Sequence, residues 1–219
     1  AGTHGGCMRL LGSKAAGINT LADLKGKVVA VNDLGSPAKN FFAILLAKQG
    51  FDPNQVDWRV FPGDLLGTAV EKGEAQAIAH WDPDTHRFLK SGTLNELATN
   101  LSGEFHDRVC CVVGVRNSLL KSDRELARSL VLALIEAHNH ASRNPRDAAE
   151  VYAEFYKPKS TVDDIYEQLT SQTHDHHPLG TDLQRQLALY TEELKLVNVI
   201  KPSTNAAKFA EKITADVLT

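Results

Sequence analysis

The sequence predicts an α/β protein with a mainly parallel sheet flanked by helices. Strand-like apolar runs alternate with helix-periodic segments between residues 17 and 114, with short connections. After an apolar run over Val109 to Val115, which we expect to be a strand, the pattern is typical of helices alone. Strands that alternate with helices indicate a parallel sheet covered on both faces.

The first strand-to-helix junction is the most informative part of the chain. A β-branched run over Val28 to Val31 is followed by Gly35, Ser36 and Pro37, and an apolar helix-periodic segment then runs to Gly50. The glycine allows close backbone approach, the serine is a preferred N-cap, and proline suits the first helical position. Such a helix start offers unpaired amide groups and a dipole that favours an anion. An ordinary strand-to-helix turn is an equally good interpretation of this junction alone.

Turn and capping residues bound the other predicted elements of the α/β part. The first is a short helix from Thr20 to Gly26, with Asp23 as the capping partner of Thr20, and a strand over Val56 to Phe61 follows it. The next helix covers Leu65 to Lys72; Pro62, Gly63 and Asp64 open it and Gly73 closes it. After a strand over Ala75 to Trp81, Asp82 caps a further helix, which Pro83 begins and which ends before Gly92. Ligands of parallel sheets bind beyond the carboxyl ends of the strands. The residues predicted at that edge are Gly35, Ser36, Pro62, Gly63, Trp81 and Asp82.

The rest of the chain predicts five helices. They cover Asp123 to Ser142, Arg146 to Phe155, Thr161 to Thr170, Asp182 to Leu196 and Asn205 to Val217. The residues expected to cap them are Asp123, Ser160 with Asp163, Thr181 and Ser203.

Composition excludes several classes of protein. The chain has 219 residues, of which 42% are hydrophobic and 23% charged, and its formal net charge of -3 gives no support for nucleic-acid binding. No apolar run approaches the ~20 residues that span a bilayer, and the first residues lack the pattern of a signal peptide, as a trimmed chain also would. Cys7, Cys110 and Cys111 are too few for a disulfide scaffold, and we expect buried thiols. A bond from Cys7 to one of the other two would require neighbouring strands.

Three sequence blocks occur in a fixed order: GINTLADLKGKVVAV, GSPAKNFFAILLAKQGFDPNQV and AVEKGEAQAIAHWDP. With them, residues 17 to 92 resemble the second lobe of the substrate-binding proteins of nitrate, sulfonate and taurine ABC importers, the group related to the NMT1/THI5 pyrimidine-synthesis proteins. The resemblance implies a type II periplasmic-binding-protein lobe over residues 17–107. Residues 1–16 and 108–219 would form the crossover strands and the helical C-terminal portion of the other lobe, whose N-terminal part is absent from this sequence.

The resemblance also implies a function without covalent chemistry and without a cofactor. The protein would capture a small anionic solute, such as a sulfonate, taurine or nitrate, and deliver it to an ABC permease, in the periplasm or at the cell envelope. The helical surface that the missing half-lobe leaves uncovered would be either exposed or covered by a second copy of the chain, as a homodimer. The implied ligand-binding residues are Thr3, His4, Gly5, Gly35, Ser36, Pro37, Gly63, Trp81 and Asp82.

These residues have assigned roles and simpler alternatives. Ser36 would donate its hydroxyl, the backbone of residues 3–6 would donate amides, Trp81 would form an apolar wall, and Asp82 would pair with the ammonium of an aminosulfonate. Trp81 is also compatible with the sheet core, and Asp82 with a capping role alone.

A histidine-rich stretch predicts a rival site. His174, His176 and His177 flank Asp175, and imidazoles beside a carboxylate can hold zinc or a similar metal, with His138 and His140 as further ligands from another helix. A solvated loop is the simpler interpretation, because consecutive histidines often point to different sides. The alternative function is therefore an NMT1/THI5-like pyrimidine-synthesis enzyme or a metal-binding relative, although no Ser/His/Asp or Cys/His nucleophile arrangement is evident.

Overall fold

The computed structural model describes residues 1–174 and 177–218, which form two compact units. We call Gly6–His106 with Glu193–Pro202 the α/β unit, and Ala1–Gly5, Asp107–Glu192 and Ser203–Thr219 the helical unit. No helix in these described ranges has the length and apolar character needed to cross a membrane.

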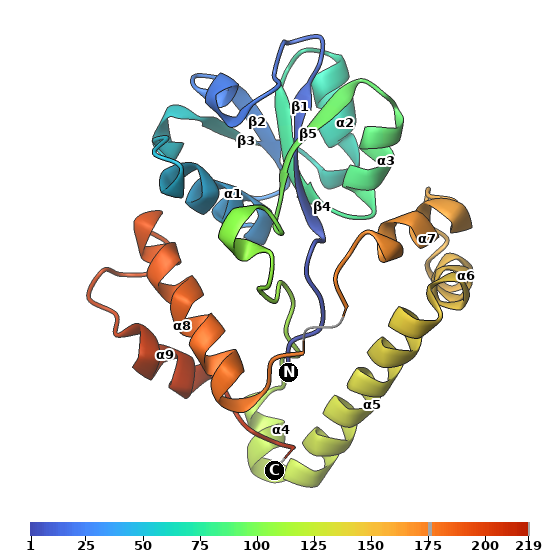
Figure 1. Ribbon diagram of the computed structural model, residues 1–219, viewed down its shortest axis with the longest axis vertical. Helices are drawn as coiled ribbons and strands as arrows, with labels where there is room; N and C mark the ends of the chain where they lie inside the picture. Colours follow the sequence, from blue (N-terminus) through green and yellow to red (C-terminus); the bar gives the residue numbers. More distant parts are fainter. Residues whose placement is uncertain (175–176, 219) are drawn as a thin grey trace. The chain divides into compact units, whose positions relative to one another are not determined.

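The α/β unit contains a five-stranded, mainly parallel sheet, which confirms the predicted fold class (Figure 1). The strands, in the spatial order β3-β2-β4-β1-β5, are β1 (Met8–Ser13), β2 (Val28–Val31), β3 (Asp57–Val60), β4 (Ala77–Trp81) and β5 (Leu94–Thr99). Strand β2 pairs in parallel with β3 and β4, whereas β1 runs antiparallel to both β4 and β5. The carboxyl ends of β2, β3 and β4 therefore meet at one edge of the sheet.

Helices cover both faces of this sheet: α1 (Pro37–Lys48), α2 (Leu66–Glu71) and α3 (Asp84–Lys90). The face that carries Leu11, Ala30 and Ile78 packs in one cluster with residues of α2 and α3. Because side chains alternate across a strand, Leu10 and Val29 lie on the other face of the sheet, which α1 covers (Figure 1). Phe42 in α1 is fully buried. The elements of this unit lie close to their predicted places.

Two predictions in the α/β part differ from the structure. Strand β5 was not expected, because a register irregularity between Leu10 and Leu11 of its partner β1 interrupts the alternation of buried residues in β5. The third helix begins at Asp84, so Pro83 precedes it instead of occupying its first position.

The helical unit contains α4 (Asn117–Ser122), α5 (Arg124–Arg143), α6 (Pro145–Tyr156), α7 (Val162–Thr170), most of α8 (Gly180–Leu196) and α9 (Ala206–Ile213). The five predicted helices are present, α9 ends earlier than expected, and α4 was not predicted. The strand predicted over residues 109–115 is wrong, because only an isolated bridge between Val112 and Gly2 forms there.

Three predicted helix caps are also wrong. The reciprocal capping box of α7 joins Thr161 and Asp164, one residue beyond the predicted pair, since each side chain accepts the other's backbone amide. Asn205 caps α9 in place of Ser203, and α8 begins at Gly180, before Thr181. Asp123 caps α5 as predicted, and accepts the amide of Leu126 at 2.9 Å.

The cysteines are less buried than predicted. All three are half-buried, and none of them forms a disulfide in the described part of the chain. Cys110 and Cys111 lie with their sulfur atoms 3.8 Å apart, in a segment without regular secondary structure.

Candidate functional site

The start of α1 is formed as the sequence predicts. Ser36 is its N-cap, with the Oγ atom accepting the Lys39 amide at 3.2 Å, and Pro37 is the first helical residue. Ser36 is almost completely buried, whereas Gly35 and Pro37 are exposed. Local capping preferences therefore place this helix tip just beyond the carboxyl end of β2.

The amides of this tip are less available than the sequence suggests. Asp33 accepts the Gly35 amide with its Oδ1 atom at 2.6 Å and the Ser36 amide with its backbone oxygen at 3.1 Å. An acidic side chain of the chain itself thus occupies a place where a bound anion would receive an amide. These two amides, which precede the first residue of α1, are therefore not open to a ligand, and within the first turn the Lys39 amide is taken by the Ser36 Oγ atom.

The carboxyl edge gathers polar side chains that the prediction did not include. A Cβ placed on Gly63 would lie 3.6 Å from Nε2 of His80 and 3.9 Å from Cβ of Asn32, so the missing side chain leaves space beside both residues. The Oδ1 atom of Asn32 and the Nδ1 atom of His80 are buried without a hydrogen-bond partner in the described part of the chain, as is Oδ1 of Asn40 in α1. Buried polar atoms without partners are rare and mark places where a ligand or water binds.

His80 is oriented by a carboxylate. Its Nε2 atom lies 3.7 Å from Oδ2 of Asp84, which favours the tautomer with the proton on Nε2. The contact with His80 lowers the pKa of Asp84, burial opposes this effect, and Arg87 lowers the pKa further. With the proton on Nε2, the unpartnered Nδ1 is an acceptor.

Trp81 and Asp82 have different surroundings. The half-buried Trp81 ring lies with its centroid 4.1 Å from that of His80, at the end of β4. Asp82 is buried, forms a 3.0 Å ion pair with Arg9, and accepts hydrogen bonds from the Thr85 hydroxyl and the His86 amide. These contacts favour the capping role of Asp82 over pairing with a ligand.

Residues 3–5 belong to the helical unit, and two of their backbone amides have partners in the fold. Thr3 donates to the carbonyl of Cys111 at 3.0 Å, and Gly5 donates to that of Thr173 at 3.1 Å. The prediction that these two amides are available to a ligand is therefore wrong.

The same backbone pairing brings His4 close to a histidine of the predicted rival site. The ring centroids of His4 and His174 lie 6.3 Å apart, and those of His138 lie 5.5 Å from His174 and 4.8 Å from His177. We call these four residues the histidine cluster. His140 is exposed and contacts Asp147 at 2.8 Å. His176 and Asp175 lie outside the described residues.

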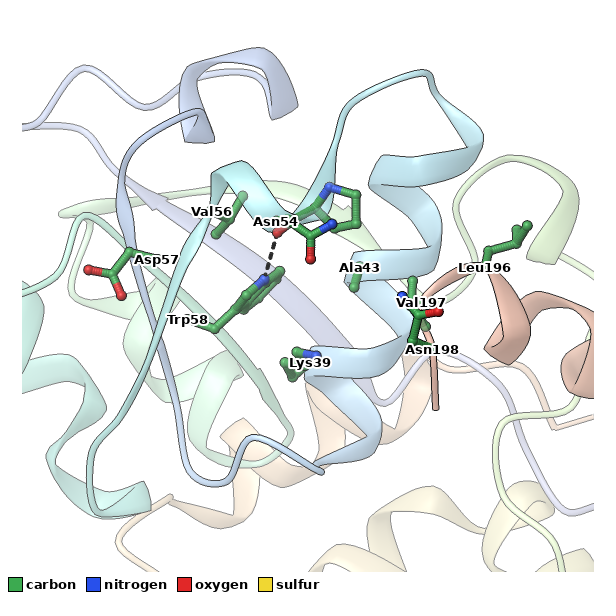
Figure 2. Close-up of a pocket in the computed structure, with 10 residues that line it drawn as sticks. Lys39, Ala43, Asn54, Val56, Asp57, Trp58, Leu196, Val197 and Asn198 are labelled. Carbon is green, nitrogen blue, oxygen red and sulfur yellow. Dashed lines mark hydrogen bonds between the residues drawn. The ribbon is translucent and has the colours of Figure 1, made fainter. Parts of the chain in front are cut away.

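A pocket of about 450 Å³ opens in the α/β unit between α1, β3 and the segment that follows α8 (Figure 2). The Lys39 amine lies 6.0 Å from the Trp58 ring centroid, and burial lowers the pKa of this lysine. The Trp58 indole donates to the carbonyl of Pro53 at 3.1 Å. Sequence patterns could not predict this pocket, because Asn198 and its neighbours on one wall are distant in the chain from the residues on the other.

Solved structures of known proteins share this fold. The alkanesulfonate-binding protein SsuA from Xanthomonas axonopodis pv. citri, bound to MOPS, is 18% identical, with a TM-score of 0.68 over 89% of this chain and 69% of that chain. The periplasmic aliphatic sulphonate binding protein SsuA from Escherichia coli is 16% identical, with a TM-score of 0.73 over 98% of this chain and 69% of its own. The periplasmic nitrate-binding protein NrtA from Synechocystis PCC 6803 is 13% identical, with a TM-score of 0.79 over 96% of this chain and 62% of its own.

These likenesses establish the periplasmic-binding-protein type of fold, since identities this low carry no information on ligands. No curated protein sequence matches the chain. The family model that matches residues 8–155 covers more than half of the sequence. The chain therefore belongs to the NMT1-like family.

Proposed function

We propose that this protein is the solute-binding component of an ABC importer. It works in the periplasm or at the cell envelope, where it captures a small anion without covalent chemistry and delivers the anion to a membrane permease. Family membership supports this proposal, as does the fold shared with proteins named for binding sulfonates and nitrate. The solute site lies at the carboxyl edge of the α/β unit, as is general for parallel sheets.

The unpartnered buried atoms at this edge carry the proposal. Asn32 Oδ1, Asn40 Oδ1 and His80 Nδ1 are all acceptors when His80 keeps its proton on Nε2. Acceptors without partners favour a solute that carries hydrogen-bond donors. The Ser36 hydroxyl can donate its proton to an anionic group while its oxygen still accepts the Lys39 amide. A solute with an ammonium and a sulfonate, such as taurine, fits this set better than nitrate does.

Calorimetric titration tests both the function and the solute class. We expect taurine to bind more tightly than ethanesulfonate, which has the sulfonate without the ammonium, and more tightly than nitrate. Binding of ethanesulfonate or nitrate in preference to taurine would contradict the role of the acceptor atoms. Absence of binding for all three solutes would contradict the proposed function.

A matched pair of capping variants tests the role of Ser36. Ser36→Ala removes a hydrogen bond to a charged group, which contributes about 1.5 to 3 kcal/mol, so affinity should fall by about tenfold or more. Thr161→Ala removes the same kind of cap from α7 in the helical unit, so it should lose stability without losing affinity. Equal affinity in the Ser36→Ala variant and the parent would remove Ser36 from the site.

A third variant separates the carboxyl edge from the pocket of Figure 2. Lys39→Met removes the charge beside Trp58 and keeps the length of the side chain. We expect unchanged affinity for taurine. Loss of binding in Lys39→Met, with normal binding in Ser36→Ala, would move the solute site to the pocket.

A further inference from the structure

The histidine cluster joins three segments of the helical unit that are distant in the sequence. His4 comes from the amino-terminal segment, His138 from α5, and His174 and His177 from the segment that follows α7. The cluster lies within one compact unit, and its four rings are partly buried. The proposed solute-binding function does not use it.

The nitrogens of His138 have distinct environments. Its Nε2 atom is buried and has no hydrogen-bond partner in the described part of the chain, while the ring forms a hydrogen bond to the backbone of His174. Because Nε2 has no partner, Nδ1 is the nitrogen that faces the His174 backbone, and Nε2 carries the lone pair in this tautomer. A buried acceptor nitrogen is then left without a donor beside it in the described part of the chain.

His174 shows the same arrangement with the two nitrogens exchanged. Its Nε2 atom contacts the carbonyl of Leu169 at 2.8 Å, and its Nδ1 atom is buried without a partner in the described ranges. A ring that donates one N–H to a backbone carbonyl and keeps the other nitrogen unprotonated is typical of histidines that bind metals, since the donated bond fixes tautomer and orientation.

We propose that the histidine cluster binds a first-row transition-metal dication such as Zn²⁺, with His138 Nε2 and His174 Nδ1 as the preorganised ligands and His177 and His4 completing the site. Imidazole nitrogens suit this class of metal. With Zn–N distances of about 2.0–2.1 Å in a tetrahedron, ring centroids lie about 5 Å apart. The separations of 5.5 and 4.8 Å around His138 agree with that spacing.

The cluster needs side-chain rotation before it can coordinate an ion. No three of its four residues have ligand nitrogens that all lie within 4.8 Å of one another. His177 and His4 are the rings that must turn, because no described residue holds either ring through a backbone hydrogen bond. The bound metal would then link the amino-terminal segment, α5 and the segment after α7, which gives it a structural role.

Isothermal titration calorimetry tests this proposal. The protein is treated with a chelator, dialysed and then titrated with ZnCl₂. We expect one zinc site whose affinity falls about tenfold or more in His138→Gln and in His177→Gln. His140→Gln is the matched control, because His140 lies on the same helix two residues away but is exposed and contacts Asp147. Its affinity for zinc should match that of the parent. If His138→Gln fails to fold, the partly buried His177→Gln still decides the result.

Two outcomes would overturn the proposal. One is the absence of zinc binding by the parent protein. The other is binding that is unchanged in both cluster variants, which would place the ion on an exposed histidine instead. The solute titration is independent, so we expect His138→Gln to bind taurine as the parent does even where it has lost zinc.

Discussion

The α/β unit and the helical unit differ in how they use apolar side chains. The twelve largest fully buried side chains among the described residues, from Leu10 to Phe105, all belong to the α/β unit. In contrast, α5 has 20 residues of which only Ala127 and Val131 are buried, and the Phe155 ring in α6 is 84% exposed. The α/β unit therefore has a core of its own, whereas the long helices present an uncovered apolar surface. Stability should depend on the first unit much more than on these faces of the second.

Substitution of two phenylalanines, one in each unit, should give the largest difference in the free energy of unfolding. Phe42 is completely buried in α1 and lies edge-on to Phe41, so Phe42→Ala should lower the free energy of unfolding by about 3 to 5 kcal/mol. Phe155→Ala should leave it unchanged. Urea unfolding is followed for Phe42→Ala by tryptophan fluorescence, which reports on the α/β unit because Trp58 and Trp81 both belong to it, and for Phe155→Ala by circular dichroism of the helices. An equal loss in the two variants would refute the contrast between the units.

Charged pairs extend the comparison to polar interactions. The side chain of Asp82 is 0% exposed and that of its partner Arg9 is 9% exposed. Asp82→Asn removes the fully buried carboxylate beside Arg9, while Glu96, its other acidic contact at 2.5 Å, is partly exposed, so a loss of about 3 kcal/mol is expected in the same unfolding experiment. Asp163→Asn removes one of two exposed acidic partners of Arg146 in the helical unit, the other being Glu150, and should not move the unfolding midpoint measured by circular dichroism. A similar shift for both variants would mean that burial does not set the strength of these pairs.

Helix caps should give a smaller effect, of similar size in the two units. Ser36→Ala and Thr161→Ala each remove one side-chain bond to a backbone amide, which typically stabilises a protein by about 1 kcal/mol. The unit affected should nevertheless differ. Tryptophan fluorescence should detect the loss at Ser36, and circular dichroism of the helices should detect the loss at Thr161. Detection of both losses by tryptophan fluorescence would show that the two units unfold together.

The smallest expected effect is a pH dependence at the carboxyl edge. Contact with His80 lowers the pKa of Asp84, so this carboxylate stabilises the fold above the ordinary aspartate pKa of about 4 and loses that effect as the pH falls through its lowered value. Asp84→Asn should be slightly less stable than the parent at neutral pH and equal to it in strong acid. The side chain is about one third exposed, so solvent screens the effect. A difference that grows towards acid would contradict the assigned contact.

Much of the α/β unit could be predicted because its signals are local. The strand, glycine, serine and proline that lead into α1 lie within ten residues of one another, and each has a conformational preference of its own. The carboxyl-edge position of Gly63 and Trp81 followed from the alternation of strands and helices. Strand β5 was missed where an irregular register breaks the alternation on which such a prediction depends.

Pairings between distant residues could not be predicted. The apolar run over residues 109–115 has the composition of a strand but lacks a neighbouring strand along its length, so it forms only one bridge. The backbone before α1 was expected to leave open amides for an anion, yet Asp33 accepts those of Gly35 and Ser36. Composition does not predict which acceptor in the folded chain binds a given amide. For this reason the partners of the Thr3 and Gly5 amides could not be predicted either.

The sequence by itself determined the fold class, the main helices and the carboxyl edge as the place for a site, because capping and side-chain periodicity act over a few residues. Only the tertiary structure decided which polar groups share that edge and which histidines meet. Asp82 pairs with Arg9 because β1 inserts beside β4, and His4 approaches His174 because the amino-terminal backbone pairs with Thr173. Such contacts join residues that are tens of positions apart, and the order of strands and the path of the backbone set them.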